Sequence, residues 1–206
     1  MLLFIVLFQF GCVPVLSLLL GVKQPEQKSI EEIRRFALKH QIPIEDCVLI
    51  REDSTAFSFA KRMNKTILFD RNGYALDFNQ HYDNKNCGGN ILSFLRGLSP
   101  VTYNARDSGM VYQNESRFWT SFDGRRAYQS PSNSDTFDYC LVHYWNSFSG
   151  RHENQKMIQN LLESVQSNPR IKVRLILVNQ DIREGINEQL FVERARAYGF
   201  QAESTN

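Results

Sequence analysis

Ser149 and His152 are the residues whose types and spacing come closest to those of a catalytic pair. They lie three residues apart at the start of a predicted helix, so a hydroxyl and an imidazole could meet there. Nucleophilic catalysis would also need an acid that orients the imidazole and an oxyanion hole, and the sequence identifies neither. A simpler interpretation is that Ser149 caps the helix beside Gly150, with Arg151 and His152 solvated in its first turn. We therefore predict no catalytic residue in this segment.

The four cysteines are the other candidates for chemistry, and their spacing limits what they can do. Cys12, Cys47, Cys87 and Cys140 lie too far apart in the chain for a CxxC pair, a zinc ribbon or haem attachment. Cys47 and Cys140 belong to apolar runs, where a free cysteine usually acts as a small buried hydrophobic residue. Cys87 lies in a polar stretch, so we expect its thiol to be accessible. A disulfide between Cys47 and Cys87 stays open at this point.

Metal and nucleic-acid sites are not indicated. A metal site built from His143, His152 and Cys87 would need three distant segments to converge without any recognisable ligand spacing. The 24 Lys and Arg residues nearly balance the 22 Asp and Glu residues, which leaves a formal charge of +2 spread along the chain. Nucleic-acid binding usually leaves a stronger basic footprint. We therefore expect no metal, no cofactor and no nucleic-acid partner.

Residues 1–21 are apolar and contain no charged side chain, and about 20 such residues span a bilayer core. A cleaved secretory signal would end in a small-residue site, which is missing here. A lipoprotein would be lipidated at Cys12 after Gly11, although Gln9 and Phe10 fit that motif poorly. An uncleaved transmembrane helix needs neither site. We predict a transmembrane anchor over residues 1–21, with lipidation of Cys12 as the alternative.

Basic residues follow the apolar segment, at Lys23, Lys28, Arg34 and Arg35. Taken alone, the positive-inside rule would place the body of the protein in the cytoplasm. A short basic segment before residue 1, lost through a misassigned start, would cancel this preference for the cytoplasm. We expect the soluble body to lie on the non-cytoplasmic side of the membrane.

The body is expected to form one α/β domain over residues 29–206, behind a linker over residues 22–28. Its first helix begins at Ser29, because Ser29 and Glu32 have the spacing of a capping box. Apolar spacing indicates further elements. The predicted strands cover residues 47–50, 139–145 and 171–178, and the predicted helices cover 89–98, 153–166 and 186–198, with another after Asp53.

A hairpin is the clearest local signal in the body. Two strand-like runs, over residues 66–70 and 74–78, flank a short turn that contains Asn72 and Gly73. Both residue types tolerate positive φ, which makes Asn-Gly the strongest short hairpin signal. Residues 99–135 are polar and rich in turn-forming residues, so we expect a long irregular connection there.

Residues 142–152, VHYWNSFSGRH, resemble the active-site segment of the thioredoxin family, in which a strand leads into a helix. Trp145, Phe148 and Gly150 match that segment. Ser149 and His152 stand where the family has its two redox cysteines, and Arg151 replaces the proline between them. Dithiol exchange needs an attacking thiolate and a resolving thiol. The resemblance therefore implies a relative that has lost thioredoxin activity.

The hairpin and the helix after it resemble the closing strand–turn–strand–helix unit of the same family. The family's cis-proline is missing, because Asn64 stands near its place. This unit precedes the strand that resembles the active site. The resemblance therefore implies either a circularly permuted order or two incomplete halves side by side. The expected fold is thioredoxin-like α/β, with a mixed sheet of four to five strands flanked by helices.

The leader and body together also look like membrane-anchored proteins of Bacteroidetes-type bacteria. This likeness implies a bacterial membrane and carries no role with it. The expected function is a redox-inactive module in the cell envelope that binds an unidentified protein partner through the surface of residues 145–152. The alternative is an atypical thiol-redox protein that uses Cys87, with or without Cys47.

Overall fold

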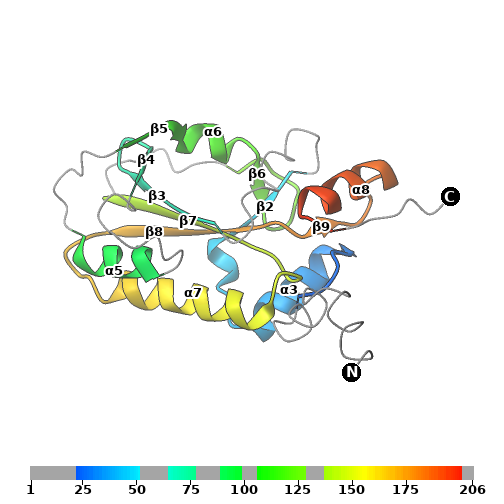
Figure 1. Cartoon of the computed structure of the whole chain (residues 1–206), viewed down its shortest axis with the longest axis horizontal. Coiled ribbons are helices and arrows are strands. Elements are labelled where there is room, and N and C mark those ends of the chain that lie inside the picture. Colours follow the sequence, from blue (N-terminus) through cyan, green and yellow to red (C-terminus); the bar gives the residue numbers. More distant parts are fainter. Residues whose placement is uncertain (1–21, 52–64, 78–88, 99–105, 129–136, 201–206) are drawn as a thin grey trace, which may run out of the picture.

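A computed structural model describes residues 22–51, 65–77, 89–98, 106–128 and 137–200. In this part of the chain, seven strands form one curled mixed sheet, and helices cover both of its faces (Figure 1). The strands of the sheet are β2 (Cys47–Ile50), β3 (Thr66–Asp70), β4 (Tyr74–Leu76), β5 (Arg106–Val111), β6 (Trp119–Ser121), β7 (Tyr139–Trp145) and β8 (Val173–Asn179). The helices are α3 (Ile30–Lys39), α5 (Gly89–Gly97), α6 (Tyr112–Ser116), α7 (Arg151–Gln166) and α8 (Glu188–Ala197), with a 3₁₀ turn at Ile44–Asp46. The α/β class expected from the sequence is therefore confirmed.

The strand order across the sheet is β5-β4-β3-β7-β8-β2-β6. The strands β7, β8 and β2 run parallel to one another, and the pairs nearer the two edges are antiparallel. Both β7 and β8 lie inside the sheet with covered faces, which explains their nearly continuous apolar sequences. The helix α7 connects β7 to β8, as the predicted parallel crossover requires.

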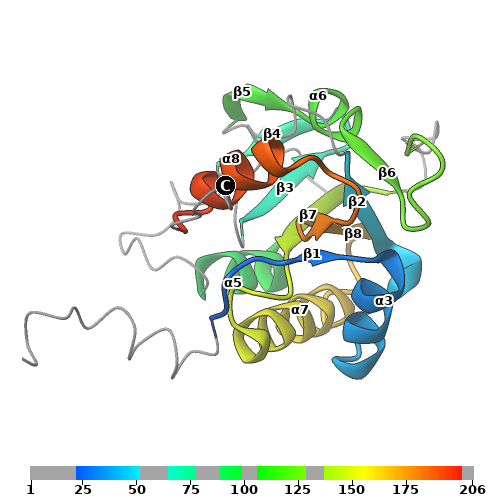
Figure 2. The same cartoon turned by 90° about the vertical axis from the view of Figure 1, so that its right-hand side faces the viewer.

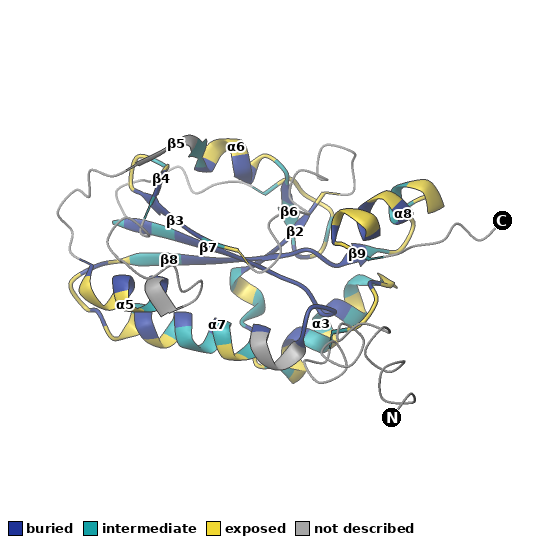
Figure 3. Ribbon diagram, in the orientation of Figure 1, coloured by how far each residue is buried: buried dark blue, intermediate teal, exposed yellow. Residues whose placement is uncertain are grey.

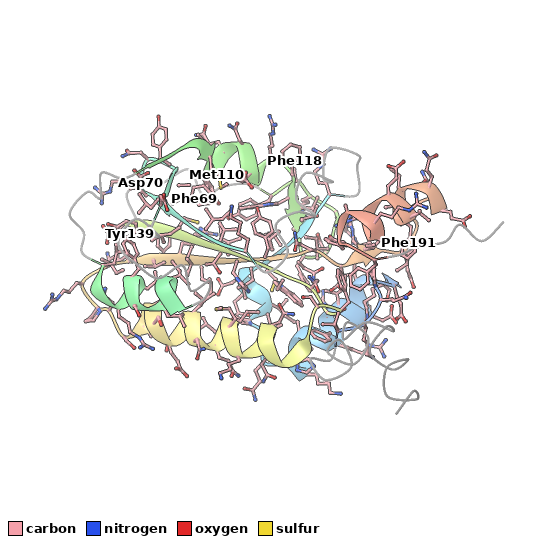
Figure 4. All side chains as sticks on the ribbon, viewed as in Figure 1. Phe69, Asp70, Met110, Phe118, Tyr139 and Phe191 are labelled. Atoms are coloured by element: carbon pink, nitrogen blue, oxygen red, sulfur yellow. The ribbon has the colours of Figure 1, made fainter. Side chains whose placement is uncertain are left out.

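Two apolar cores lie on opposite faces of the sheet. In both views α3, α5 and α7 lie below the sheet and α6 and α8 lie above it (Figures 1 and 2). Successive side chains of β7 alternate between the two cores, so Leu141 and Trp145 join the lower one and Val142 and Tyr144 the upper one. In Figure 3 the strands that lie between the helices are coloured largely dark blue, which marks buried residues. Figure 4 shows Phe69 in the upper part of the molecule, where it belongs to the upper core.

Two local predictions are confirmed in atomic detail. The Ser29 hydroxyl accepts a hydrogen bond from the Glu32 amide at 3.3 Å, and the Glu32 carboxylate accepts one from the Ser29 amide at 2.8 Å. The Ser29 amide and the Ser29 hydroxyl, which donates to the same carboxylate oxygen at 2.9 Å, hold the pKa of the Glu32 carboxyl below its ordinary value. In the hairpin, one carboxylate oxygen of Asp70 accepts the amides of Asn72 and Tyr74, both at 2.9 Å. Of the two predicted turn residues, Gly73 alone takes a positive φ, of 81°.

The sheet is larger than expected, because residues 99–135 are not an irregular connection throughout. They contribute β5, α6 and β6, and the two strands extend opposite edges of the sheet. An alternation of apolar and polar residues arises where one face of a strand is buried and the other is in contact with water, and a short strand can lack it. The sequence of β5, RDSGMV, has no such pattern, and β6 has only three residues, of which Trp119 is fully buried.

Residues 22–28, the predicted linker, lie against the domain, and we name them the strap. Within the strap, β1 (Gln27–Lys28) pairs in parallel with β9 (Ile182–Arg183), which follows β8. The strap continues back toward residue 22 through Pro25, which is buried. The predicted anchor over residues 1–21 and the helix expected after Asp53 lie outside the described residues. No helix in the described ranges has the length and apolar character needed to cross a bilayer.

Candidate functional site

The carboxyl ends of β7 and β8 are where this fold would place a ligand. The chain leaves β7 toward α7 on the lower face, and it leaves β8 through β9 toward α8 on the upper face (Figures 1 and 2). Two neighbouring parallel strands with connections to opposite faces form a topological switch point. Such points open a crevice at the carboxyl edge of the sheet. Residues 145–152, the segment singled out in the sequence, begin at this edge.

The Asp181 carboxylate holds the two strand ends together. Asp181 is 2% exposed, and it accepts hydrogen bonds from the Ser147 hydroxyl at 2.7 Å and from the Asn179 side-chain amide at 2.8 Å. The Ser147 backbone amide donates to both carboxylate oxygens, at 3.0 and 3.2 Å. A buried carboxylate is costly unless donors surround it. Here the donors come from the turn after β7 and from the last residue of β8, so Asp181 fixes that turn to the end of β8.

A second set of hydrogen bonds holds the start of α7. The side-chain oxygen of Asn146 accepts from the amides of Phe148 at 3.2 Å and Ser149 at 2.7 Å. The side-chain amide of Asn154 lies within 3.0 Å of the Asn146 carbonyl, 3.2 Å of the Ser149 hydroxyl and 3.1 Å of the Gly150 carbonyl. All of these polar side chains are buried. Together with the contacts of Asp181, they form what we name the closure network: Asn146, Ser147, Ser149, Asn154, Asn179 and Asp181.

The interpretation of Ser149 as the helix cap is wrong. Gly150 occupies the capping position of α7 with a φ of 100°, and no side chain caps the helix there. A positive φ of this size favours glycine, because it has no Cβ to clash with the backbone. Ser149 is 8% exposed and faces Asn154 in the closure network. Arg151 and His152 form the first turn of α7, and their side chains lie outside the described part of the chain.

The aromatic residues of the segment belong to the interior. Trp145 has no exposed surface, and its ring is stacked near that of Phe36 on α3, with 6.1 Å between centroids. Phe148 is 2% exposed and packs against Tyr198 and Phe200, with centroid distances of 5.1 and 5.8 Å. The expected partner surface over residues 145–152 is therefore corrected, because the side chains of residues 145–149 are buried.

The strap covers this segment from outside. Val22 forms an antiparallel bridge with Ser149, and the Lys23 amide donates to the Phe148 carbonyl at 2.7 Å. An extended segment that adds backbone hydrogen bonds to a neighbouring chain is a common mode of peptide recognition. Here the protein's own strap makes this contact, so it takes the place that a bound peptide would need.

Buried polar groups also hold α8 at the same edge. The Tyr198 hydroxyl donates to the Gln180 carbonyl at 2.8 Å, and the Arg194 guanidinium reaches the same carbonyl at 3.4 Å. Arg194 is 2% exposed and also donates to the Tyr198 hydroxyl at 3.3 Å. Removing any one of these groups would leave buried polar atoms with fewer partners. The crevice at the switch point is thus filled by the protein's own side chains from both faces.

The described cysteines are poor nucleophiles. Cys47 is a free thiol that is 4% exposed and donates to the Pro43 carbonyl at 3.2 Å, and burial raises its pKa strongly. Cys140 is also a free thiol, and burial raises its pKa to about 12. Thiol reactivity depends on the thiolate, so both residues are suited to packing rather than exchange. Cys87, the partner considered for a disulfide with Cys47, lies outside the described residues, as does Cys12.

His143 is a buried core residue. It is 1% exposed, and its Nδ1 lies 2.9 Å from the hydroxyl of Thr66 on the neighbouring strand. It faces the side of the sheet opposite to Val142 and Tyr144, as strand alternation predicts. Burial lowers the pKa of His143 to about 4, so the ring is neutral near pH 7. In the described ranges, no group of three metal-ligating side chains comes together.

An open groove lies beside the closed edge, between the beginnings of α3 and α8. It has a volume of about 640 Å³, and β1 and β9 line part of it. Apolar and charged side chains both reach it, and those used below are Ile30, Ile186, Leu190, Glu31, Arg183 and Glu184. We name this hollow the α3–α8 groove. It is a concave surface of the size that ligand sites usually have.

Sequence reasoning missed the centre of the site. Asn146, Asn154 and Asp181 were not singled out, although polar residues directly follow both predicted parallel strands. These polar residues could have located the site, because the carboxyl ends of neighbouring parallel strands meet at one edge of the sheet. No known protein family, curated protein or solved structure matches this chain.

Proposed function

We propose that this chain is a membrane-tethered, redox-inactive thioredoxin-like module that binds another protein in the bacterial cell envelope. Residues 1–21 provide the tether, as a transmembrane helix or through a lipid on Cys12. The domain lies on the non-cytoplasmic side. The single observation that carries the proposal is the closure network, which occupies the position that a dithiol would need at the end of β7.

The strand arrangement supports the thioredoxin-like part of the proposal. The unit β7-α7-β8 corresponds to the family's active-site strand, helix and next parallel strand. The unit β3-β4-α5 corresponds to the closing hairpin and helix, and β3 lies antiparallel beside β7 in the same sheet. The helices α5 and α7 pack on one face. One continuous sheet favours a circularly permuted order over two separate halves.

The groups at the edge support the proposed lack of thioredoxin-type redox activity at residues 149–152. A serine hydroxyl cannot accept and donate electrons as a thiol pair does. Ser149 is also held by Asn154 and covered by the strap, so no exchange partner could reach its position. The raised pKa values of Cys47 and Cys140 give no support to a redox role for either thiol.

The α3–α8 groove is the surface that we assign to the protein partner. It lies at the same edge of the sheet as residues 145–152, and it stays open where that segment is covered by the strap. Its apolar residues, Ile30, Ile186 and Leu190, can receive the side chains of a polypeptide. Charged groups at Glu31 and Arg183 can fix the direction of that polypeptide.

Photo-crosslinking tests this assignment. We expect benzoylphenylalanine at Glu31 or Glu184, which line the groove and are exposed, to form discrete protein adducts in intact cells. The same probe at Ser93, an exposed residue of α5 at the opposite end of the molecule from α3 and α8, serves as the matched control and should give none of these adducts. Leu190→Arg would place a long charged side chain in the groove and should remove the adducts at both positions.

Two results would count against the proposal. Equal adducts from Ser93 and from the groove positions would indicate nonspecific contact with neighbouring proteins. Adducts that persist unchanged in the Leu190→Arg variant would show that the groove is not the surface that the partner occupies.

A further inference from the structure

The strap fixes where the predicted tether enters the domain. Residue 22 is the first described residue, and Val22 is bridged to Ser149 at the carboxyl edge of the sheet. Lys23 is bonded to Phe148, and β1 continues the attachment to β9. The strap is therefore attached to the domain at both of its ends and is not a free linker. If those residues enter a bilayer, this edge of the domain is held at the membrane surface.

Basic side chains surround a small hollow at this edge. The hollow has a volume of about 130 Å³ and lies between the strap and α3. Its lining includes three lysines and one acidic residue, Lys23, Lys28, Lys39 and Glu26, around the rings of Phe36, His40 and Phe148. The lining is thus positively charged beside the point where the tether enters.

An exposed apolar side chain adjoins the lysines. Leu38 on α3 is 62% exposed, and it is one of two large apolar side chains in the described ranges that are strongly exposed. Arg35, Leu38 and Lys39 are spaced i, i+3 and i+4, so they share the outer face of the helix, where all three are exposed. Basic residues around an apolar one are typical of surfaces that lie at a membrane interface.

We infer that Lys23, Lys28, Arg35, Leu38 and Lys39 form a docking face that rests on anionic phospholipid headgroups. The inference rests on the tether of the proposed function, because the tether brings this edge to the bilayer. Each lysine near an anionic surface strengthens membrane binding by about fivefold at low salt. Leu38 enters the interfacial region. The strap holds Lys23 and Lys28 in place, and α3 positions Lys39. The α3–α8 groove beside this face is then held at a fixed height above the bilayer.

Quenching by brominated lipids tests the docking face in the full chain. The natural Trp119 and Trp145 have no exposed surface, so they give a constant background. We add one tryptophan by Leu38→Trp and reconstitute the protein in vesicles of brominated phosphatidylcholine, with or without phosphatidylglycerol. Strong quenching of the added tryptophan is expected with phosphatidylglycerol, and much weaker quenching is expected without it or at high salt.

Two controls define the position and the charge dependence. Tyr74→Trp adds the probe at the other strongly exposed apolar residue, on the hairpin far from α3, and it should not be quenched. The triple change Lys23→Gln, Lys28→Gln and Lys39→Gln should weaken docking by about a hundredfold and abolish quenching at position 38. The same change at three exposed lysines elsewhere, Lys65, Lys156 and Lys172, should leave it unchanged.

Flotation of the same vesicles separates the docking face from the tether. Protein that floats with both kinds of vesicle while position 38 stays unquenched overturns the docking face and leaves the tether intact. Protein that floats and is quenched only with phosphatidylglycerol supports the docking face and overturns the tether. Protein that floats with neither kind overturns both.

Discussion

Replacing Asp181 with alanine is expected to lower the free energy of unfolding by about 4 kcal/mol. The carboxylate accepts the Ser147 amide, the Ser147 hydroxyl and the Asn179 side-chain amide, and all of these groups are buried. Alanine would leave several buried donors without an acceptor, and each unsatisfied buried group costs about 1–3 kcal/mol. Urea unfolding followed by circular dichroism measures the change. The Asp181→Asn variant should have a free energy of unfolding between those of the natural protein and of Asp181→Ala, because an amide keeps the volume and part of the accepting capacity.

Asp123 provides the matched control for this substitution. Its carboxylate also accepts a serine hydroxyl, from Ser121, and a backbone amide, from Arg125 at 3.0 Å, but the residue is exposed. Water can replace the lost carboxylate there, so Asp123→Ala should cost less than about 1 kcal/mol. Equal losses for Asp123→Ala and Asp181→Ala would mean that the closure network is open to water.

The protein is expected to lose about 2 kcal/mol of stability through His143 alone when the pH falls from 7 to 5, and about 3 kcal/mol by pH 4. Burial lowers the folded-state pKa to about 4, below the ordinary value of 6.5 that applies to the unfolded chain. Between these two values the unfolded chain binds a proton that the folded protein does not bind. Acidification therefore favours unfolding, and this contribution is complete once the pH has fallen through the folded pKa.

A variant without the imidazole isolates this contribution. His143→Leu combined with Thr66→Val removes the ring and its partner together, so no hydroxyl is left without the ring that it faced. The natural protein and this variant share every other titrating group. Their free energies of unfolding are therefore compared from pH 7 to pH 4. The free energy of unfolding of the natural protein minus that of the variant should decrease by the amounts given above as the pH falls. A difference that is independent of pH would mean that His143 is solvated in the folded state.

The sequence predicted those parts of the fold that depend on local patterns. The capping box at Ser29 and the hairpin around Gly73 were found because neighbouring residues determine both structures. The strands β7 and β8 were found because burial on both faces demands continuous apolar runs. The edge strands β5 and β6 were not found, since their pairing depends on distant partners rather than on their own composition.

The sequence pointed to the candidate site only by its place along the chain. The expected likeness to the thioredoxin family directed attention to residues 145–152, but spacing alone could not indicate that Ser149 faces inward. That orientation depends on Gly150, whose positive φ starts α7 one residue later, and on Asn154 one turn further along. The strap was missed for a similar reason, because a short polar segment carries no signal of the surface on which it lies.

Amide hydrogen exchange over residues 145–150 tests the central claim most directly, since that claim is that the protein's own chain closes this edge. The amides of Ser147, Phe148 and Ser149 donate to buried side chains, and the strap covers them. Mass spectrometry of peptides from the full chain should therefore show exchange as slow as in β7 itself. Exchange as fast as in the exposed turn at residues 123–126 would contradict the account, because it would mean that the edge is open.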